Sequence, residues 1–303
     1  MATSRAHTVA TAIEHPSVLE ALRGLKRRTT HVRPDNEGIV SVGGVMAAIK
    51  PDTAVVSVMY ANNEVGSVQP IKRIARAIRE LRKKRRSPYP YLHVDACQAT
   101  AWLPMDVQAL GADLVVLNGT KAYGPRGIAA LYVRRGVRLS PQTLGGQQEL
   151  GRRAGTEDVP GAAGLAHALE LVKPSDAVRV GKLWDGFMAR LPAILPDARY
   201  NGPAPAHSLP NIINISVPGT SSEELLLALD RVGIRAGAGS ACTAHRVEPS
   251  HVLVAMGVPR PYLGGTLRFS LSRTTTKADL GRLAAVLPRV VATVRSRHVE
   301  AES

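Results

Sequence analysis

Short apolar runs alternate with amphipathic segments through the first half of the chain. Strand-length apolar runs occur at Thr8–Ile13, Thr53–Tyr60, Tyr91–Val94, Asp113–Leu117 and Ile128–Val133. Helical spacing of apolar residues follows Pro16, which suits a first helical turn, and recurs after Pro70 from Ile71 to Leu81. Strands that are apolar throughout and separated by helices are typical of a mainly parallel sheet covered on both faces. The pattern therefore predicts an α/β fold.

The second half of the chain is dominated by helical patterns. Strands are expected at Ile212–Val217, Ile234–Ala236 and Thr266–Leu271. The run Ser221–Glu224 has the form of a capping box, and a last helix should begin near Lys277 and be kinked or broken by Pro288. The polar, Pro-containing stretch Lys173–Asp176 marks a boundary. We expect a large domain over residues 1–172 and a smaller C-terminal α+β domain over 173–303.

The chain is strongly basic, with a formal net charge of +15. Such a charge suggests nucleic acid or an acidic partner. The basic residues are dispersed, however, and the dense run Arg82–Arg86 ends a helical pattern, where a solvated helix end is the simpler interpretation. Aromatic residues make up only 4% of the chain, which leaves few stacking platforms for single-stranded nucleic acid. A nucleic-acid-binding module is therefore a distant alternative.

Two cysteines, Cys97 and Cys242, lie far apart without paired spacing, so neither a disulfide framework nor a metal site is indicated. No run approaches membrane-spanning length, and the first residues lack the apolar core of a signal peptide. A cytoplasmic location is the expectation.

Polar residues follow three of the predicted strands. They are Asn62–Glu64, Asp95–Gln98 and Asn118–Lys121. Ligands of open parallel sheets bind at the carboxyl ends of the strands, so these groups should converge on one crevice. Lys121 lies on a Gly-rich loop between apolar runs, where lost hydration would lower its pKa and suit it to form a Schiff base. Taken alone, this stretch is better explained as an ordinary hairpin turn with a solvated lysine, and Asp95 is more often an ordinary N-cap.

Nine short blocks along the chain carry a family resemblance. They are Ile13–Pro16, Ala61–Gly66, His93–Gln98, Lys121, Tyr123–Gly127, Gly145–Glu149, Arg153–Glu157, Gly239–Thr243 and Leu267–Leu271. In this order they resemble the pyridoxal-phosphate-dependent cysteine desulfurases (NifS/IscS type) of the class V aminotransferases. The resemblance covers essentially the whole chain and implies the PLP-dependent transferase fold type I.

The resemblance implies a role for each matching residue. Lys121 would carry pyridoxal 5'-phosphate (PLP) as a Schiff base, and Asp95 would pair with the pyridinium nitrogen so that the ring acts as an electron sink. Gln98 would hydrogen-bond the phenolic oxygen and His15 would stack on the ring. Residues that would hold the substrate carboxylate or the cofactor are Asn63, Arg268, Asn118, Thr120 and Thr156, the last reaching the cofactor of a neighbouring subunit in a homodimer.

Cys242 matches the nucleophile that takes sulfur from L-cysteine as an enzyme persulfide and releases alanine. Small residues before it, from Ala236 to Ala241, are consistent with a mobile loop. The alternative is a buried structural cysteine, since free cysteine is among the most buried residue types. That alternative is the one we expect for Cys97.

Two departures from the family stand out. Asn118-Gly119-Thr120-Lys121 replaces the usual Ser-Gly-His-Lys, which removes an imidazole contact and is expected to lower affinity for the cofactor. Residues 1–12 contain no counterpart of the Gly-Thr-Glu-type loop that cradles the cofactor phosphate in the family. The expectation is either a piece of a longer enzyme or an incomplete phosphate site with weakened activity.

The sequence thus predicts a cysteine desulfurase that supplies sulfur to an acceptor or scaffold protein for iron–sulfur cluster assembly or tRNA thiolation. A selenocysteine lyase is the alternative within the same chemistry. A catalytically inactive homologue that acts as a partner protein is the alternative from another class.

Overall fold

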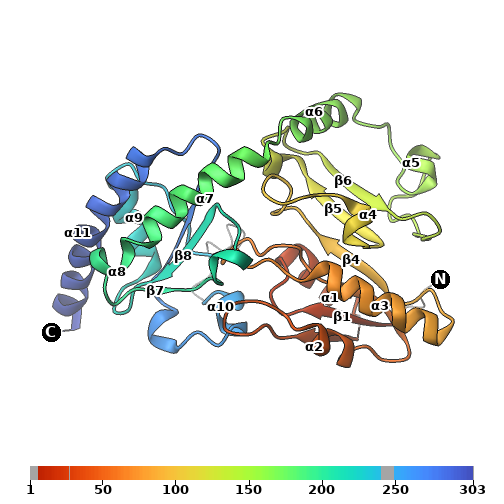
Figure 1. Ribbon diagram of the computed structural model, residues 1–303, viewed down its shortest axis with the longest axis horizontal. Coiled ribbons are helices and arrows are strands. Elements are labelled where there is room, and N and C mark those ends of the chain that lie inside the picture. Colours follow the sequence, from red (N-terminus) through yellow and green to blue (C-terminus); the bar gives the residue numbers. More distant parts are fainter. Residues whose placement is uncertain (1–5, 27, 240–248, 303) are drawn as a thin grey trace.

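The computed structural model of the chain describes residues 6–26, 28–239 and 249–302, with side chains as far as Ser296. Its larger sheet has six strands in the order β2-β1-β3-β4-β5-β6 (Figure 1). The strands are β1 (His7–Thr11), β2 (Thr29–Val32), β3 (Thr53–Ser57), β4 (Tyr91–Asp95), β5 (Leu114–Asn118) and β6 (Ala129–Val133). The first five strands run parallel, and β6 is antiparallel to β5. The predicted mainly parallel α/β sheet is confirmed.

Helices connect these strands and follow them. They are α1 (Pro16–Gly24), α2 (Val42–Ala47), α3 (Ile71–Arg85), α4 (Val107–Leu110), the 3₁₀ turn η1 (Gly119–Ala122), α5 (Gln148–Gly151) and α6 (Val159–Glu170). The helices expected after Pro16 and Pro70 are both present, and the run Arg82–Arg85 forms the last turn of α3. Cations at that end complement the helix dipole, which agrees with the simpler interpretation of this run.

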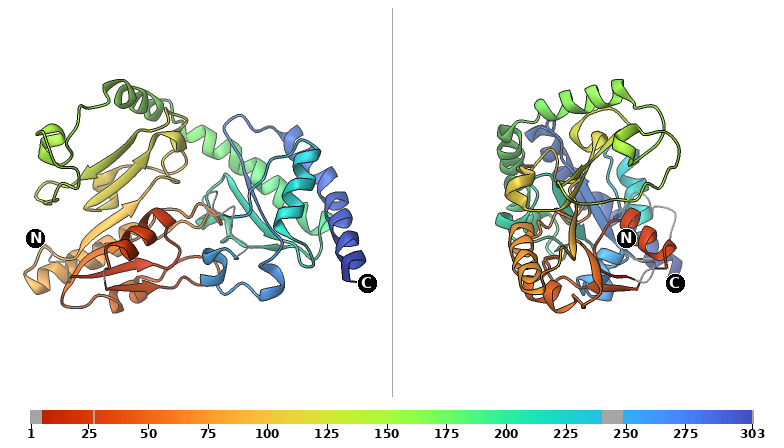
Figure 2. Two further views of the ribbon diagram at one scale, coloured as in Figure 1. Left: turned by 180° about the vertical axis from the view of Figure 1, so that it is seen from behind. Right: turned by 90° about the vertical axis from the view of Figure 1, so that its right-hand side faces the viewer.

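The second half contains a smaller antiparallel sheet in the order β7-β8-β9, with β7 (Arg199–Tyr200), β8 (Ile212–Ser216) and β9 (Thr266–Ser270). Its helices are α7 (Pro174–Met188), α8 (Leu191–Ile194), η2 (Pro205–His207), α9 (Ser222–Arg231), α10 (His251–Ala255), η4 (Arg260–Tyr262) and α11 (Lys277–Glu302). Figure 2 shows the two sheets as separate parts, and α7 extends from the end of α6 to the smaller sheet. The smaller α+β part is thus present, while the domain boundary near residue 173 stays a prediction.

The boundary stretch Lys173–Asp176 lies at the start of α7, where Pro174 occupies the first helical turn. Three expectations for local structure are not met in full. Ile234–Ala236 forms no strand, and only one isolated bridge, between Gly237 and Arg268, joins this segment to β9. Helix α11 runs through Pro288 without a break. The Ser221 side chain makes no cap bond, so the serine half of the expected capping box is absent.

The sheet is also not covered on both faces along its whole width. In β6, Ala129 and Leu131 are exposed, and Leu131 retains 48% of its accessible surface. The strands β1 and β3, by contrast, are almost fully buried. Burial therefore falls off toward β6, which is the last strand of the sheet within the part of the chain that the structure describes.

The second half of the chain packs against the carboxyl ends of β1 and β3. Val252 and Leu253 of α10 join an apolar cluster with Ile13, Met59 and Val65. Burying a side chain of this size contributes about 1.5–3 kcal/mol. The loops that follow β1 and β3 are thereby held between the two sheets.

Candidate active site

Asp95 ends strand β4 and is half-buried. Its Oδ1 accepts a hydrogen bond from the backbone N–H of Cys97 at 2.9 Å, which fixes the carboxylate at the carboxyl end of the strand. Gln98 follows in the same turn and is half-buried. The carboxylate and the amide therefore lie where ligands of parallel sheets bind, as the sequence predicts.

Lys121 lies on the η1 turn, directly after β5. Asn118 caps this turn, and its Oδ1 accepts bonds from the Thr120 N–H at 2.9 Å and the Thr120 hydroxyl at 2.6 Å. Lys121 itself is exposed, so the expectation that its amine is buried among apolar segments is wrong. The reason is that the apolar runs on either side form the β5–β6 pair at the less buried end of the sheet.

His15 is the N-cap residue of α1, and its Nδ1 accepts a bond from the backbone N–H of Ser17 at 3.1 Å. Because Nδ1 is an acceptor, the neutral ring carries its hydrogen on Nε2. Burial lowers the pKa of His15, and among nearby charges Asp95 and Glu64 raise it while Lys121 and His251 lower it. Charges act on a group in this way only at short range.

The loop after β1, the end of β4 and the η1 turn after β5 lie at one edge of the larger sheet, because these strands run parallel in the order β1-β3-β4-β5. These three segments carry His15, Asp95 and Lys121. Asp95 and Lys121 also act on Cys97. The strand ends thus lie side by side as expected, and the convergence of the three side chains on one crevice stays a prediction.

Cys97 behaves as a structural thiol. It is a free, half-buried cysteine whose Sγ lies 3.9 Å from the carbonyl oxygen of Val116. Burial and the neighbouring Asp95 carboxylate raise the pKa of the thiol, which keeps it protonated at neutral pH. The structural role expected for Cys97 stays a prediction, which its half-buried position supports.

Arg268 reaches the pocket from β9 of the smaller sheet. Its Nη1 donates to the backbone carbonyl of Asn63 at 3.0 Å, and its guanidinium is largely withdrawn from water. Burial lowers the pKa of Arg268, and Glu64 raises it. Within the described residues its buried Nε has no hydrogen-bond partner. The planar guanidinium is the group that binds carboxylates with two hydrogen bonds, as the expected role of Arg268 requires.

The loop after β3 is fixed by Asn62 rather than by Asn63. The Asn62 Oδ1 accepts bonds from the N–H groups of Glu64 and Val65, and its Nδ2 donates to the Ile13 carbonyl. The buried Glu64 accepts a 2.5 Å bond from the Ser250 hydroxyl. Asn62 and Glu64 therefore hold the pocket wall, which leaves the Asn63 side chain available at its surface.

Several polar residues near the pocket carry no sequence prediction of their own. Glu14 is fully buried, and it bonds Ser57, which in turn bonds His93. His251 of α10 lies with its Nε2 3.0 Å from the Glu14 carbonyl oxygen. In the sequence, Glu14 and His93 could be noticed only because they lie in the same motifs as His15 and Asp95. Nothing in the sequence points to His251.

Thr156 lies apart from these residues in sequence, in the exposed segment between α5 and α6. Leu150 of α5 and Val159 of α6, on either side of this segment, are also exposed, at 87% and 68% of their surface. Cys242 lies outside the described residues.

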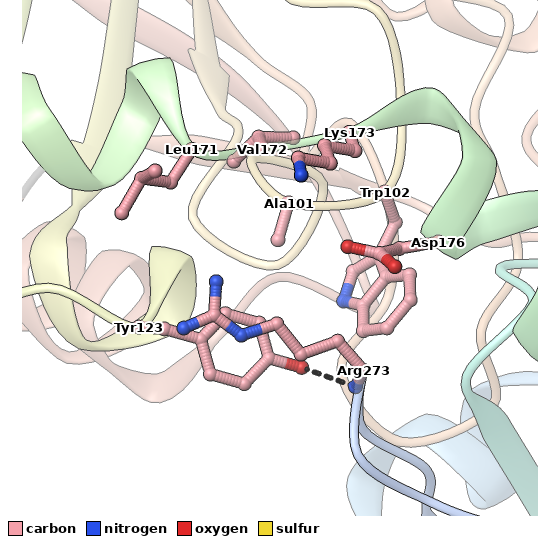
Figure 3. Close-up of a pocket in the computed structure, with 8 residues that line it drawn as sticks. All are labelled: Ala101, Trp102, Tyr123, Leu171, Val172, Lys173, Asp176 and Arg273. Atoms are coloured by element: carbon pink, nitrogen blue, oxygen red, sulfur yellow. Dashed lines mark hydrogen bonds between the residues drawn. The ribbon is translucent and has the colours of Figure 1, made fainter.

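The η1 turn is tied to the second half of the chain by Tyr123. Figure 3 shows the Arg273 guanidinium over the Tyr123 ring, 4.4 Å from its centroid, and the Arg273 backbone N–H donating to the Tyr123 hydroxyl at 3.1 Å. The cavity beside this contact has a volume of only about 10 Å³, room for one water at most. It is a structural contact that supports the Lys121 turn and not a ligand site.

Two further observations concern metal binding and membrane-spanning helices. In the described part of the chain, no group of three or more His, Cys, Asp or Glu side chains is arranged to hold a metal ion. None of the described helices is both long and apolar enough to cross a membrane.

Comparison with known proteins places this pocket in a family context. The family model described as aminotransferase class-V matches residues 2–283. A cysteine desulfurase of Nostoc sp. is 40% identical over 296 residues, which cover 96% of this chain and 72% of that protein. A solved NifS-like protein superposes with a TM-score of 0.85 at 30% identity, covering 96% of this chain and 76% of the other. A structure described as SspA in complex with cysteine has a TM-score of 0.72 at 30% identity, with 91% and 76% covered.

Proposed function

The chain belongs to the class-V aminotransferase family, and on that premise we propose that it is a PLP-dependent cysteine desulfurase. The observation that carries the proposal is the placement of His15, Asp95 and Lys121 after neighbouring parallel strands at one edge of the larger sheet, where Arg268 bonds the loop that follows β3. A similar solved structure is described as a complex with cysteine, which supports cysteine as the substrate.

The residues present fit PLP. The exposed amine of Lys121 is accessible for covalent attachment, and the Asp95 carboxylate keeps one oxygen free of the Cys97 bond to accept the pyridinium N–H. His15 would lie against the ring, and Gln98 would bond its phenolic oxygen. Asn118 and Thr120 are bonded to each other, so either must exchange that bond to reach a phosphate.

When bound, PLP supplies an electron sink that labilises bonds at the substrate α-carbon. Arg268 would bind the substrate carboxylate through its guanidinium, whose Nη1 donates to the Asn63 carbonyl. His15, with its hydrogen on Nε2, is positioned to exchange a proton in the pocket. The Cys242 thiolate attacks the substrate sulfur, the carbon–sulfur bond breaks, and protonation of that carbon gives alanine and an enzyme persulfide.

We propose that the protein acts as a homodimer and passes sulfur to an acceptor or iron–sulfur scaffold protein, for cluster assembly or tRNA thiolation. The exposed apolar residues on either side of the segment that carries Thr156 support a subunit contact there. They are Leu144, Leu150 and Val159, with 82%, 87% and 68% of their surface accessible. A cytoplasmic location stays a prediction.

Reconstitution with PLP tests the proposal. The full chain should gain the visible absorbance of a lysine Schiff base and form alanine from L-cysteine. Lys121→Ala should abolish the absorbance, whereas the exposed-lysine control Lys72→Ala should retain it. Cys242→Ser should keep the absorbance and form no persulfide.

The same assays separate the alternatives. Faster turnover of selenocysteine than of cysteine would indicate a selenocysteine lyase. A wild-type chain that stays colourless at saturating PLP would overturn the proposal and leave a non-catalytic homologue.

A further inference from the structure

A row of polar side chains, with Glu14 and Ser57 buried and His93 half-buried, crosses three neighbouring strands of the larger sheet. It consists of Glu14, which follows β1, Ser57 at the end of β3, and His93 in β4. The Glu14 Oε2 lies 3.2 Å from the Ser57 hydroxyl oxygen, and that oxygen lies 2.9 Å from the His93 Nδ1. We call these three residues the buried polar row.

Glu14 is held rigidly at the inner end of the row. It has no accessible surface, and its Oε1 accepts bonds of 2.6 Å from both the Thr11 hydroxyl and the Met59 N–H. No cationic side chain bonds to it among the described residues. A carboxylate in this position has only hydrogen bonds to compensate for its burial, so each bond has a defined direction.

The direction of these bonds fixes the His93 ring. An ionised carboxylate only accepts hydrogen bonds, so the single hydroxyl hydrogen of Ser57 points to Glu14. The Ser57 oxygen is then an acceptor toward His93, whose Nδ1 must carry a hydrogen. The neutral ring consequently has its lone pair on Nε2.

The row lies next to the carboxylate proposed to bind PLP. His93 and Asp95 are two residues apart on β4, so both side chains stand on the same face of the sheet. The Asp95 charge acts on both His93 and Glu14. The other titratable groups at this end of the row are His15, adjacent in sequence, and His251, which contacts the Glu14 carbonyl.

We propose that Glu14 is a positioning residue: through Ser57 it holds His93 in the Nδ1–H tautomer, which leaves the Asp95 carboxylate free of a competing donor from Nε2. The link from Glu14 to His93 stands on the hydrogen bonds alone. Its consequence for cofactor binding rests on the proposed function. Burial raises the pKa of Glu14 to about 7 in spite of the bonds from Thr11, Met59 and Ser57, so the carboxylate form dominates above neutral pH.

The first test reads the tautomer directly. Nitrogen NMR of histidine-labelled protein without added PLP, at about pH 8.5, should show His93 with its hydrogen on Nδ1, the signal being assigned with His93→Gln. In Glu14→Gln the amide donates to Ser57, whose hydrogen turns to His93, so the ring should change to the Nε2–H form. Thr11→Val removes another bond to the same carboxylate, leaves the path through Ser57 intact, and should retain Nδ1–H.

An Nε2–H ring in the wild type, or an unchanged ring in Glu14→Gln, would overturn the link. A shift in Thr11→Val equal to that in Glu14→Gln would also overturn it, because it would show a general disturbance of the carboxylate.

The second test concerns cofactor binding by the full chain. Glu14→Gln should raise the dissociation constant for PLP by about 3- to 10-fold, the effect of one hydrogen bond of ordinary strength, while Thr11→Val should not. A changed tautomer with unchanged PLP affinity would overturn the positioning role. Should the wild type bind no PLP, the proposed function fails on its own, and the tautomer measurement still decides whether Glu14 controls His93.

Discussion

Replacing Glu14 by Gln should make the protein less sensitive to pH between about 4.5 and 7. Burial raises the pKa of Glu14 from its ordinary value of 4.5 to about 7. Below pH 4.5 the folded and unfolded states are both protonated at this residue, so its full contribution to stability is present. As the pH rises the unfolded chain releases its proton first, and stability is lost until the folded state also ionises near pH 7.

The size of the effect follows from the same shift. At about 1.4 kcal/mol per pH unit, the rise from 4.5 to about 7 corresponds to about 3 kcal/mol. Urea unfolding at several pH values measures the free energy of unfolding of the wild type and of Glu14→Gln. The difference between the two should shift by about 3 kcal/mol in favour of Glu14→Gln as the pH rises through this range.

The exposed Glu20 provides a matched control. It pairs with Arg23 on the surface of α1, with 54% of its side chain accessible, so Glu20→Gln should follow the wild-type pH dependence closely. Histidines titrate in the same range, but they are common to all three proteins. If the difference in the free energy of unfolding between the wild type and Glu14→Gln stays constant from pH 5 to pH 8, the reasoning is refuted. Such a result would mean that Glu14 ionises as readily in the folded protein as in water.

Three further predictions concern other parts of the structure. Asp113→Ala should destabilise the fold by about 3–5 kcal/mol in urea unfolding, because the buried carboxylate bonds Arg82, Arg134 and the Leu92 N–H, which would all lose a partner; a loss below about 1 kcal/mol would contradict this. Cys97→Ala should leave persulfide formation from L-cysteine intact, whereas Cys242→Ser should abolish it, and loss of activity in Cys97→Ala alone would reverse the assignment of the two thiols. Tyr123→Phe removes the bond from the Arg273 N–H but keeps the ring under the guanidinium, so unfolding measurements should show a loss of only about 0.5–1.5 kcal/mol; Tyr123→Ala should cost more.

Much of the fold is predictable because hydrophobic period identifies buried elements. The strands β1, β3, β4, β5 and β6 of the larger sheet and the helices after Pro16 and Pro70 follow from it directly. Strand β2 is not predicted by this pattern, because only Val32 among its residues is buried. Helix α2 is not predicted either, because Gly43 and Gly44 weaken its helical pattern. The break expected at Pro288 is absent for a different reason. Helix propensity is easily outweighed by tertiary packing, and Leu287, Val290 and Val291 pack in the core on either side of the proline, so α11 continues across it.

The candidate site is predictable only in part. The rule that strand ends converge in a parallel sheet brings Asp95 and Lys121 together, and the family motifs add His15 and Arg268. The buried polar row does not follow from either source, because its contacts join residues 43 and 36 positions apart. No spacing in the sequence indicates that Glu14 faces a serine on the neighbouring strand, and only the register of β1, β3 and β4 creates that contact.

The exposure of Lys121 shows why an apolar sequence context does not establish burial. The runs on either side of the lysine form β5 and β6, which pair with each other and satisfy their backbone groups. That pairing needs no cover over β6, and Leu131 stays half accessible there. The turn between the strands is fixed by Asn118 and by the contact of Tyr123 with Arg273, and neither of these withdraws the amine from water. Desolvation of the Lys121 amine must therefore come from what binds in the pocket rather than from the strands that carry it, whereas Asp95 and His15 are already partly buried by the fold.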